Sequence, residues 1–177
     1  KTIVAVYEYT DERGEVLYEN VRYQPKGFRQ RRPDGEGGYI YNLDGIDRVP
    51  YHLPELIDAI QSGNDRICFT EGEKDADNLR SLGIVATSFK NWTNSLNPYI
   101  EGSHALLFRD HDTSGVKQAN DAARIIAEVA KSVKVIDLFD GEPIPEKHGL
   151  DVSDWIETRR SQGSDNAAII YDLAVAE

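Results

Sequence analysis

Methionine is absent from this sequence of 177 residues, even at position 1, and cysteine occurs once, as Cys68. We therefore treat the chain as part of a longer protein or as a trimmed one. A single thiol excludes an intrachain disulfide and a cysteine-based zinc cluster within the chain. Because Cys68 stands between Ile67 and Phe69 in an apolar run, we expect a small buried side chain there rather than a nucleophile.

Long hydrophobic runs are absent as well. No stretch approaches the roughly 20 apolar residues that a membrane-spanning helix needs, and no charged start followed by an apolar stretch indicates a signal peptide. The hydrophobic and charged fractions, 40% and 29%, are those of an ordinary globular protein. We expect a cytoplasmic protein without a membrane partner, built as one domain or as a domain with a small appendage.

Basic residues are scarce overall. Twenty stand against 31 acidic ones, and the net charge of −11 argues against a protein that binds nucleic acid over its whole surface. Residues 22–32 are the exception, because they contain no acid and five cations, Arg22, Lys26, Arg29, Arg31 and Arg32. A local basic strip on an acidic chain suits an enzyme that holds a phosphate backbone beside bound metal ions.

The alternation within this strip suggests a strand. In extended chain Arg29 and Arg31 share one face, and Phe28 and Arg32 share the other. We predict that Lys26, Arg29, Arg31 and Arg32 contact phosphates and that Phe28 stacks on a base. The alternative is a solvated edge strand that its charges protect from pairing with other strands.

Residues 1–50 are predicted to form a small, mainly antiparallel, β-rich subdomain. Residues 3–9 and 16–23 are rich in β-branched and aromatic side chains and flank a turn at 11–14, which indicates a hairpin. Residues 28–32 and 39–43 are expected to form two further short strands around a glycine-rich turn.

Residues 51–177 are predicted to form an α/β domain with a mostly parallel sheet flanked by helices, because strands and helices alternate there. The expected strands are 66–70, 84–89, 104–109 and 133–139. The expected helices are 53–62, 74–82, 114–132, 151–160 and 166–176. Parallel sheets of this kind carry their active sites at the carboxyl ends of the strands.

The first candidate group follows the strand predicted at 66–70. Glu71 comes directly after it, and Gly72 lets a ligand approach the backbone closely. Asp75 lies one helical turn further on, near the same end, with Lys74 beside it. The alternative is that Glu71 and Asp75 only favour a helix N-terminus through its macrodipole, and these residues alone leave both interpretations open.

The second group, Asp110-His111-Asp112, follows an apolar strand. Asp110 and Asp112 share one face of an extended chain while His111 points away, and Gly115 permits a close turn. A divalent cation would relieve the repulsion of the two carboxylates, and Mg²⁺ needs only one or two of them beside water and phosphate oxygens. The alternative assigns both acids to loop and helix-capping positions.

A third group, Asp151 and Asp154, precedes Trp155 after the last strand. Helix capping, with Asp151 at the N-cap and Asp154 at N3, explains this group as well as a further metal ligand does. Together the three groups predict a divalent-metal site at neighbouring strand tips and chemistry on nucleic-acid phosphodiesters.

These motifs resemble the TOPRIM domain shared by bacterial-type primases, type IA and II topoisomerases and some nucleases. The likeness covers residues 64–157, where Glu71-Gly72 matches the family's Glu-Gly motif and Asp110-His111-Asp112 its Asp-x-Asp motif. Residues 7–9, 28–33, 50–56 and 151–155 resemble, more closely, primases and primase-helicases of phages, prophages and plasmids. With these segments the resemblance covers most of the chain.

The resemblance implies a metal site. Asp110 and Asp112 would hold Mg²⁺ or Mn²⁺, helped by Asp151 or Asp154. Glu71 would be a metal ligand or the general base for an attacking 3′-hydroxyl. These roles agree with nucleotidyl transfer, which needs cations to neutralise the charge that develops on phosphate oxygens.

The resemblance also implies substrates and partners. Asp75 would bind metal or orient its neighbours, and Lys74 and the cations at 29, 31 and 32 would hold triphosphate or template. The reaction would be RNA primer synthesis from nucleoside triphosphates on a single-stranded DNA template, by a DNA primase core. A zinc-binding module upstream and a helicase domain or partner downstream are expected.

Three other functions stay open. One is metal-dependent strand cleavage by a TOPRIM-type nuclease or topoisomerase. Another is a non-catalytic module that binds metal or nucleic acid. The third is a receiver-like or phosphohydrolase domain, which also carries acids at strand ends.

Overall fold

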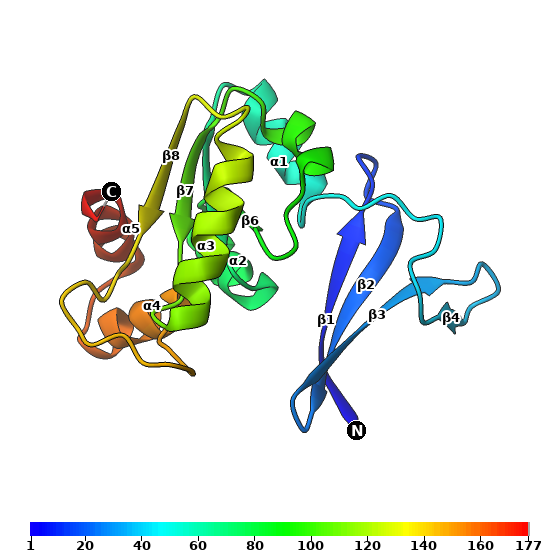
Figure 1. The fold of residues 1–177 in the computed structure, drawn as a ribbon, viewed down its shortest axis with the longest axis horizontal. Coiled ribbons are helices and arrows are strands. Elements are labelled where there is room, and N and C mark those ends of the chain that lie inside the picture. The colour runs from blue at the N-terminus through cyan, green and yellow to red at the C-terminus, as the bar shows by residue number, and fades with distance from the viewer. Residues whose placement is uncertain (177) are drawn as a thin grey trace.

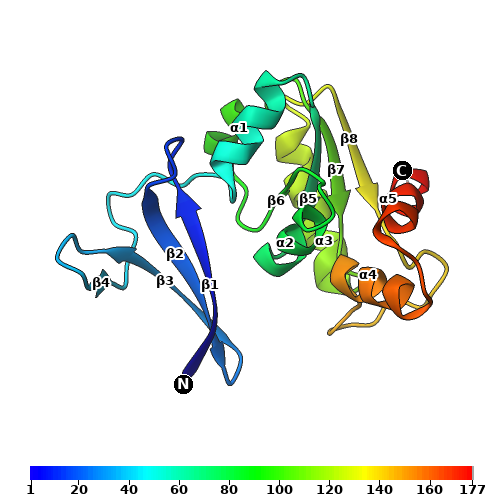
Figure 2. The same ribbon diagram turned by 180° about the vertical axis from the view of Figure 1, so that it is seen from behind.

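The computed structural model describes residues 1–176, which contain two four-stranded sheets lying side by side (Figures 1 and 2). The antiparallel sheet has the order β1 (Thr2–Thr10), β2 (Val16–Gln24), β3 (Gly27–Pro33), β4 (Tyr39–Ile40). The parallel sheet has the order β6 (Ala86–Ser88), β5 (Arg66–Thr70), β7 (His104–Phe108), β8 (Ser132–Ile136). The predicted α/β class, with a parallel sheet and a small antiparallel N-terminal sheet, is confirmed.

Helices cover both faces of the parallel sheet (Figure 1). One face packs on α2 (Glu73–Arg80), α4 (Val152–Ser161) and α5 (Asn166–Val175). The other packs on α1 (Leu53–Gln61), the 3₁₀ helix η1 (Asn94–Ile100) and α3 (Thr113–Ile126). None of the helices described for residues 1–176 has the length and apolar content that a membrane crossing requires.

Alternation along the strands explains the two layers. In β5, Ile67 and Phe69 face the layer that contains α3, whereas Cys68 faces the layer that contains α2. Leu107 and Leu106 of β7 divide in the same way. Each fully buried side chain of this size stabilises the fold by about 1.5–3 kcal/mol, so both faces of the sheet need their helices.

Several boundaries differ from the predictions, among them the end of β8 at Ile136 instead of 139 and that of α2 at Arg80 instead of 82. β4 has two residues instead of five, because Asn42 turns the chain by accepting a hydrogen bond from the amide of Asp44 (3.2 Å). β6 pairs with β5 over three residues only. α3 ends at Ile126 and not at Ser132, because the chain must turn back to start β8. η1 was not predicted, since Pro98 interrupts any helical pattern there.

The two sheets share polar and apolar contacts. Tyr7 of β1 packs in the same core as Tyr51 and the helices α2 and α4. Glu73, 4% exposed, accepts hydrogen bonds from the Tyr9 hydroxyl (2.9 Å) and the Asn20 side chain (2.7 Å). The antiparallel sheet is therefore tied to the N-terminus of α2, and a domain division at residue 50 stays a prediction.

Candidate active site

The acids at 71, 110 and 112 leave adjacent parallel strands at the same edge of the sheet. β5 and β7 pair in register up to Thr70 and Phe108, and Glu71 and the Asp110 segment follow directly. Asp110 and Asp112 both lie close enough to Glu71 to perturb its pKa. The structure brings these three carboxyl groups near one another, and their role as a metal site stays a prediction.

We call Glu71, Asp75, Asp110 and Asp112 the acid cluster. Burial and mutual repulsion raise the pKa values of Glu71, Asp75 and Asp110. Burial first, and then the charges of Glu71, Asp75 and Asp151, raises the pKa of Asp110 to about 8. The pKa of Asp75 rises to about 6, again through burial first and the charge of Asp151 second. Burial also raises the pKa of Glu71, against the opposing charge of Lys90. Such a group of carboxyls favours either protons or a cation.

One of the two carboxylate oxygens of Glu71 is available to a ligand. Its Oε1 accepts a hydrogen bond from Gln118 on α3 (3.1 Å), and its backbone carbonyl accepts one from the Ser88 hydroxyl (2.9 Å). Its Oε2 is buried and has no hydrogen-bond partner. Because an unpaired buried oxygen is unfavourable, this atom is suited to a ligand that the cluster would bind.

Asp112 is the N-cap of α3, as the capping interpretation predicted. Its carboxylate accepts hydrogen bonds from the amides of Gly115 (2.8 Å) and Gly149 (3.2 Å). Burial opposes ionisation, but these amides outweigh it and lower the pKa of Asp112. Asp112 is thus ionised and fixed in direction, and each of its oxygens keeps a lone pair for a further partner.

The two glycines around Asp112 allow a close backbone approach. A Cβ at Gly115 would lie 2.3 Å from the carbonyl oxygen of Asp110, and one at Gly149 would lie 2.2 Å from that of His111. Neither distance is compatible with a side chain. The close turn predicted at Gly115 is therefore present, and Gly149 provides a second one.

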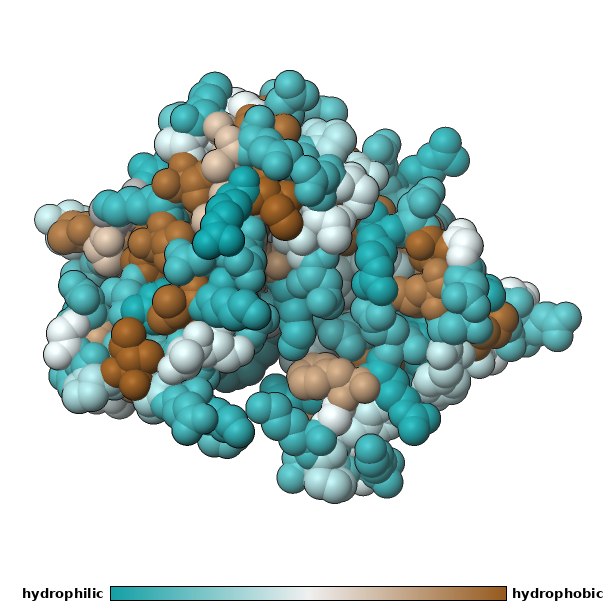
Figure 3. Space-filling view, viewed as in Figure 1, coloured by the Kyte–Doolittle hydropathy of each residue, from teal (hydrophilic) through white to brown (hydrophobic). Residues whose placement is uncertain are grey.

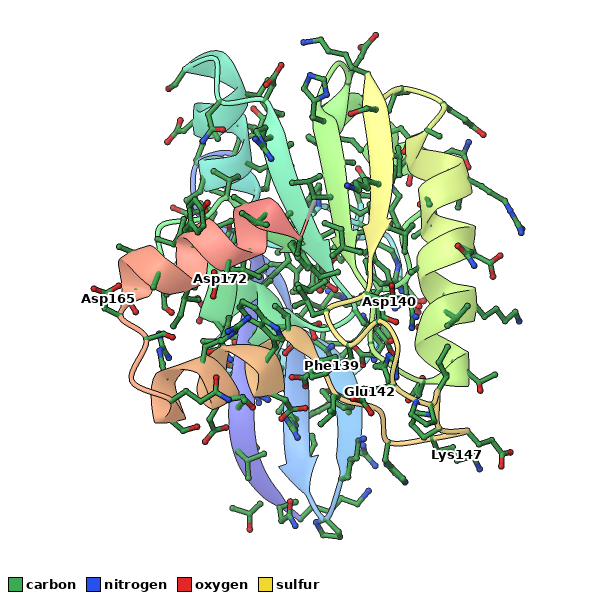
Figure 4. All side chains as sticks on the ribbon, turned by 90° about the vertical axis from the view of Figure 1, so that its left-hand side faces the viewer. Phe139, Asp140, Glu142, Lys147, Asp165 and Asp172 are labelled. Atoms are coloured by element: carbon green, nitrogen blue, oxygen red, sulfur yellow. The ribbon has the colours of Figure 1, made fainter. Side chains whose placement is uncertain are left out.

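His111 points away from the two aspartates, as the alternation predicted. It is 3% exposed, and its Nδ1 lies 2.9 Å from Asp137 at the end of β8, which also pairs with Arg109. After β8, the loop that contains Phe139 and Lys147 crosses the edge where the strands end and leads to α4 (Figure 4). This network fixes the backbone that carries Asp110 and Asp112.

Asp151 and Asp154 form the predicted capping box at the start of α4. Asp151 accepts a hydrogen bond from the Asp154 amide (2.8 Å), and Asp154 accepts one from the Asp151 amide (3.0 Å). Asp151 also lies 3.7 Å from the exposed ammonium group of Lys74 and raises the pKa of Asp75. The capping interpretation holds, and the same residues border the acid cluster.

The donor set suits a hard divalent cation, which prefers carboxylate oxygens. Within residues 1–176, however, no three His, Cys, Asp or Glu side chains already converge on a point that an ion would occupy. The partnerless oxygen of Glu71 and the close approach of Asp110 are the features that fit a metal. Mg²⁺ or Mn²⁺ would be held by two or three of these groups with water or substrate oxygens.

The basic strip divides into buried and exposed cations. Arg31 is 9% exposed, forms an ion pair with Glu19 and lies 3.5 Å from the centre of the Tyr39 ring. Lys26 and Arg29 are exposed, and the half-buried Arg32 has an Nε without a hydrogen-bond partner. Arg31 thus has partners inside the sheet, whereas Lys26 and Arg29 are free to meet a ligand.

Lys90, Gln118 and Ser153 belong to the site but were not predicted. Lys90 lowers the pKa of Glu71, and its ammonium group lies 5.2 Å from the centre of the exposed Phe28 ring. The hydroxyl of Ser153 donates a hydrogen bond to Asp75. The surface between the two sheets is mainly hydrophilic and is notched at its lower edge (Figure 3). Lys90 follows β6. The rule that active-site residues lie at the carboxyl ends of parallel strands, which identified Glu71, therefore also applied to Lys90.

No protein-family model and no curated protein matches this sequence. Solved structures of primases do match. The zinc-binding and RNA polymerase domains of Aquifex aeolicus primase superpose with a TM-score of 0.55 at 19% identity, over 88% of this chain and 38% of that one. The primase fragment of the bacteriophage T7 primase-helicase gives 0.51 at 20% identity, over 74% of this chain.

A third match belongs to the complex of T7 lagging-strand DNA polymerase with the primase domains of two gp4 subunits. It has a TM-score of 0.53 at 17% identity and covers 94% of this chain and 74% of the matched one. This chain spans 51% of the T7 primase fragment. The chain therefore has the fold of primase catalytic fragments.

Proposed function

We propose that this chain is the catalytic core of a TOPRIM-type DNA primase, of the kind found in phages, prophages and plasmids. The observation that carries the proposal is the pair Glu71 and Asp110. They stand at adjacent strand ends with raised pKa values and one partnerless carboxylate oxygen, in a chain with a primase-type fold.

The reaction is template-directed nucleotidyl transfer. The 3′-hydroxyl of the growing RNA attacks the α-phosphorus of a nucleoside triphosphate, a P–O bond forms, and diphosphate leaves. Mg²⁺ or Mn²⁺, when bound, neutralises the charge on the phosphate oxygens. Glu71, whose pKa is raised, is placed to accept the hydroxyl proton or to hold the metal.

The neighbouring residues support this chemistry. Asp110 and Asp112 hold the metal, Asp151 or Asp154 assists, and Asp75 holds metal or orients its neighbours. Asp112 need not lose a proton to bind a cation, because two backbone amides keep it ionised.

Positive side chains on α2 and on the antiparallel sheet hold the nucleotide and the nucleic acid. Lys74 lies at the α2 side of the acids, within 3.7 Å of Asp151, and contacts the triphosphate. Lys26 and Arg29 hold the template backbone, assisted by the less exposed Arg31 and Arg32 further along the strand. We also propose that the protein is cytoplasmic and works together with a zinc-binding module and a helicase.

One assay separates this function from its alternatives. The protein is incubated with single-stranded DNA, nucleoside triphosphates and Mg²⁺ or Mn²⁺, and both the template and new RNA are measured. New short RNA, lost in Asp110→Asn, supports primer synthesis. Shortened template would instead identify a nuclease, and strand binding without turnover would identify a binding module.

A further inference from the structure

Three tyrosines surround Arg31 on the antiparallel sheet. The guanidinium group lies 3.5 Å from the centre of the Tyr39 ring, and the Tyr39 hydroxyl donates to Glu19 (3.4 Å). Tyr41 lies beside Arg31 and Tyr23, and its pKa is lowered, first through Arg31. We call Tyr23, Tyr39 and Tyr41 the tyrosine platform.

The tyrosine platform lies on the sheet face that points away from the acid cluster. On β2, Tyr18 and Asn20 bond to Val49 and Glu73, so they face the rest of the protein. Glu19, between them, therefore faces outward, and so does its partner Arg31. β4, which carries Tyr39, lies beyond β3 on the side remote from the parallel sheet (Figures 1 and 2).

The rings are exposed yet fixed in place. Tyr39 is 43% and Tyr41 54% exposed, although tyrosine usually buries most of its ring. The ion pair between Arg31 and Glu19 holds the tyrosine platform in place from within the sheet, because both residues are buried. Aromatic side chains that are held rigidly lose little conformational freedom when a ligand stacks on them.

The ionised groups beside the tyrosine platform favour a ligand with a negative backbone. Arg29 shares the outward face of β3 with Arg31 and is exposed, and Lys26 lies at the nearby hairpin tip. Glu19 is 5% exposed and already paired. The exposed acids nearby are Glu8, which pairs with Glu19 on β1, and Asp34 and Glu36 in the turn between β3 and β4, where Asp34 already accepts two backbone hydrogen bonds. Flat rings next to cations match a strand of bases and phosphates, whereas an acidic peptide would use the cations only.

We propose that the tyrosine platform and Arg29 bind the bases and backbone of a single nucleic-acid strand, at a surface separate from the acid cluster. This inference rests on the proposed function only for the identity of the partner, a nucleic-acid strand. Such a surface would hold a strand away from its reacting end and so add affinity without taking part in the chemistry.

Strand binding in EDTA tests this site without the metal-dependent chemistry. The full chain is titrated onto labelled oligothymidylate and onto an abasic strand of equal length, at fixed salt, with anisotropy as the readout. We expect Tyr39→Leu/Tyr41→Leu to weaken oligothymidylate binding at least about five-fold and abasic binding less than about two-fold. Tyr171→Leu, at an exposed tyrosine of α5 (69%), serves as the matched control and should change neither.

Two further variants separate stacking from loss of structure. Tyr39→Phe/Tyr41→Phe keeps the rings and should retain the affinity, and Tyr41→Leu alone covers the case in which the double variant unfolds. Equal affinity of Tyr41→Leu and the unmodified chain for oligothymidylate would overturn the proposal, as would equal losses on both strands. Asp110→Asn should bind normally, so failure of primer synthesis and failure of this site are distinguishable.

Discussion

Replacing Asp110 by asparagine should make the metal-free protein more stable at neutral pH. The pKa of Asp110 is about 8 in the folded protein, against an ordinary value of 3.8. Between these values the unfolded chain is ionised while the folded one must keep a proton, so this carboxyl lowers stability as the pH rises. Asparagine carries no charge and does not have this penalty.

The size of the effect follows from the pKa difference. At about 1.4 kcal/mol per pH unit, the interval from 3.8 to pH 7 sets a ceiling of about 4 kcal/mol. The charge of Glu71 contributes to this pKa, so the two titrations depend on each other, and solvent reaches part of the group; we therefore expect a gain of about 1–2 kcal/mol at pH 7. At pH 4.5 the gain should nearly vanish.

Urea unfolding in EDTA at both pH values measures this difference. Asp112→Asn is the matched control, because the pKa of Asp112 is lowered and its carboxylate supports the fold at neutral pH. It should lose stability at pH 7 where Asp110→Asn gains it. A gain for Asp110→Asn that is the same at both pH values, or a loss at pH 7, would refute the reasoning.

Three further predictions concern the support of the site. Glu73→Ala leaves the buried Asn20 amide and the part-buried Tyr9 hydroxyl without a partner and should lower the free energy of unfolding by roughly 2–4 kcal/mol in urea titrations; an unchanged midpoint would contradict it. Gly115→Ala should weaken Mn²⁺ binding at least about ten-fold in calorimetry by displacing the backbone of the proposed metal-binding loop, whereas Gly27→Ala, with its nearest atom at 3.7 Å, should not. Arg31→Ala leaves the buried Glu19 with no positive partner and only the Tyr39 hydroxyl as a donor, so a drop of about 2–4 kcal/mol is expected, and equal stability would show that the ion pair is dispensable.

The strands and the strand-end acids were predictable because they depend on local patterns. The run Ile67–Phe69 is apolar and flanked by polar residues, and β5 spans it together with Arg66 and Thr70. Alternation in extended chain was enough to separate His111 from its two neighbours. The capping box of Asp151 and Asp154 is also local, spanning four residues.

Features that depend on distant partners were not predictable. The partner of Arg31, Glu19, is fixed by the register of β2 against β3, which no single stretch of sequence specifies. Likewise, Lys90 approaches Glu71 only because β6 lies beside β5. The donor of the hydrogen bond to Asp75, Ser153, lies 78 residues further along the chain. Such contacts follow from the fold as a whole.

Crystals soaked in Mn²⁺, with anomalous scattering to locate the ion, test the proposed metal site most directly. We expect a peak within coordination distance of Glu71 and of Asp110 or Asp112, and its loss in Asp110→Asn. A peak bound elsewhere, or none at millimolar Mn²⁺ with these carboxyls unchanged, would contradict the assignment.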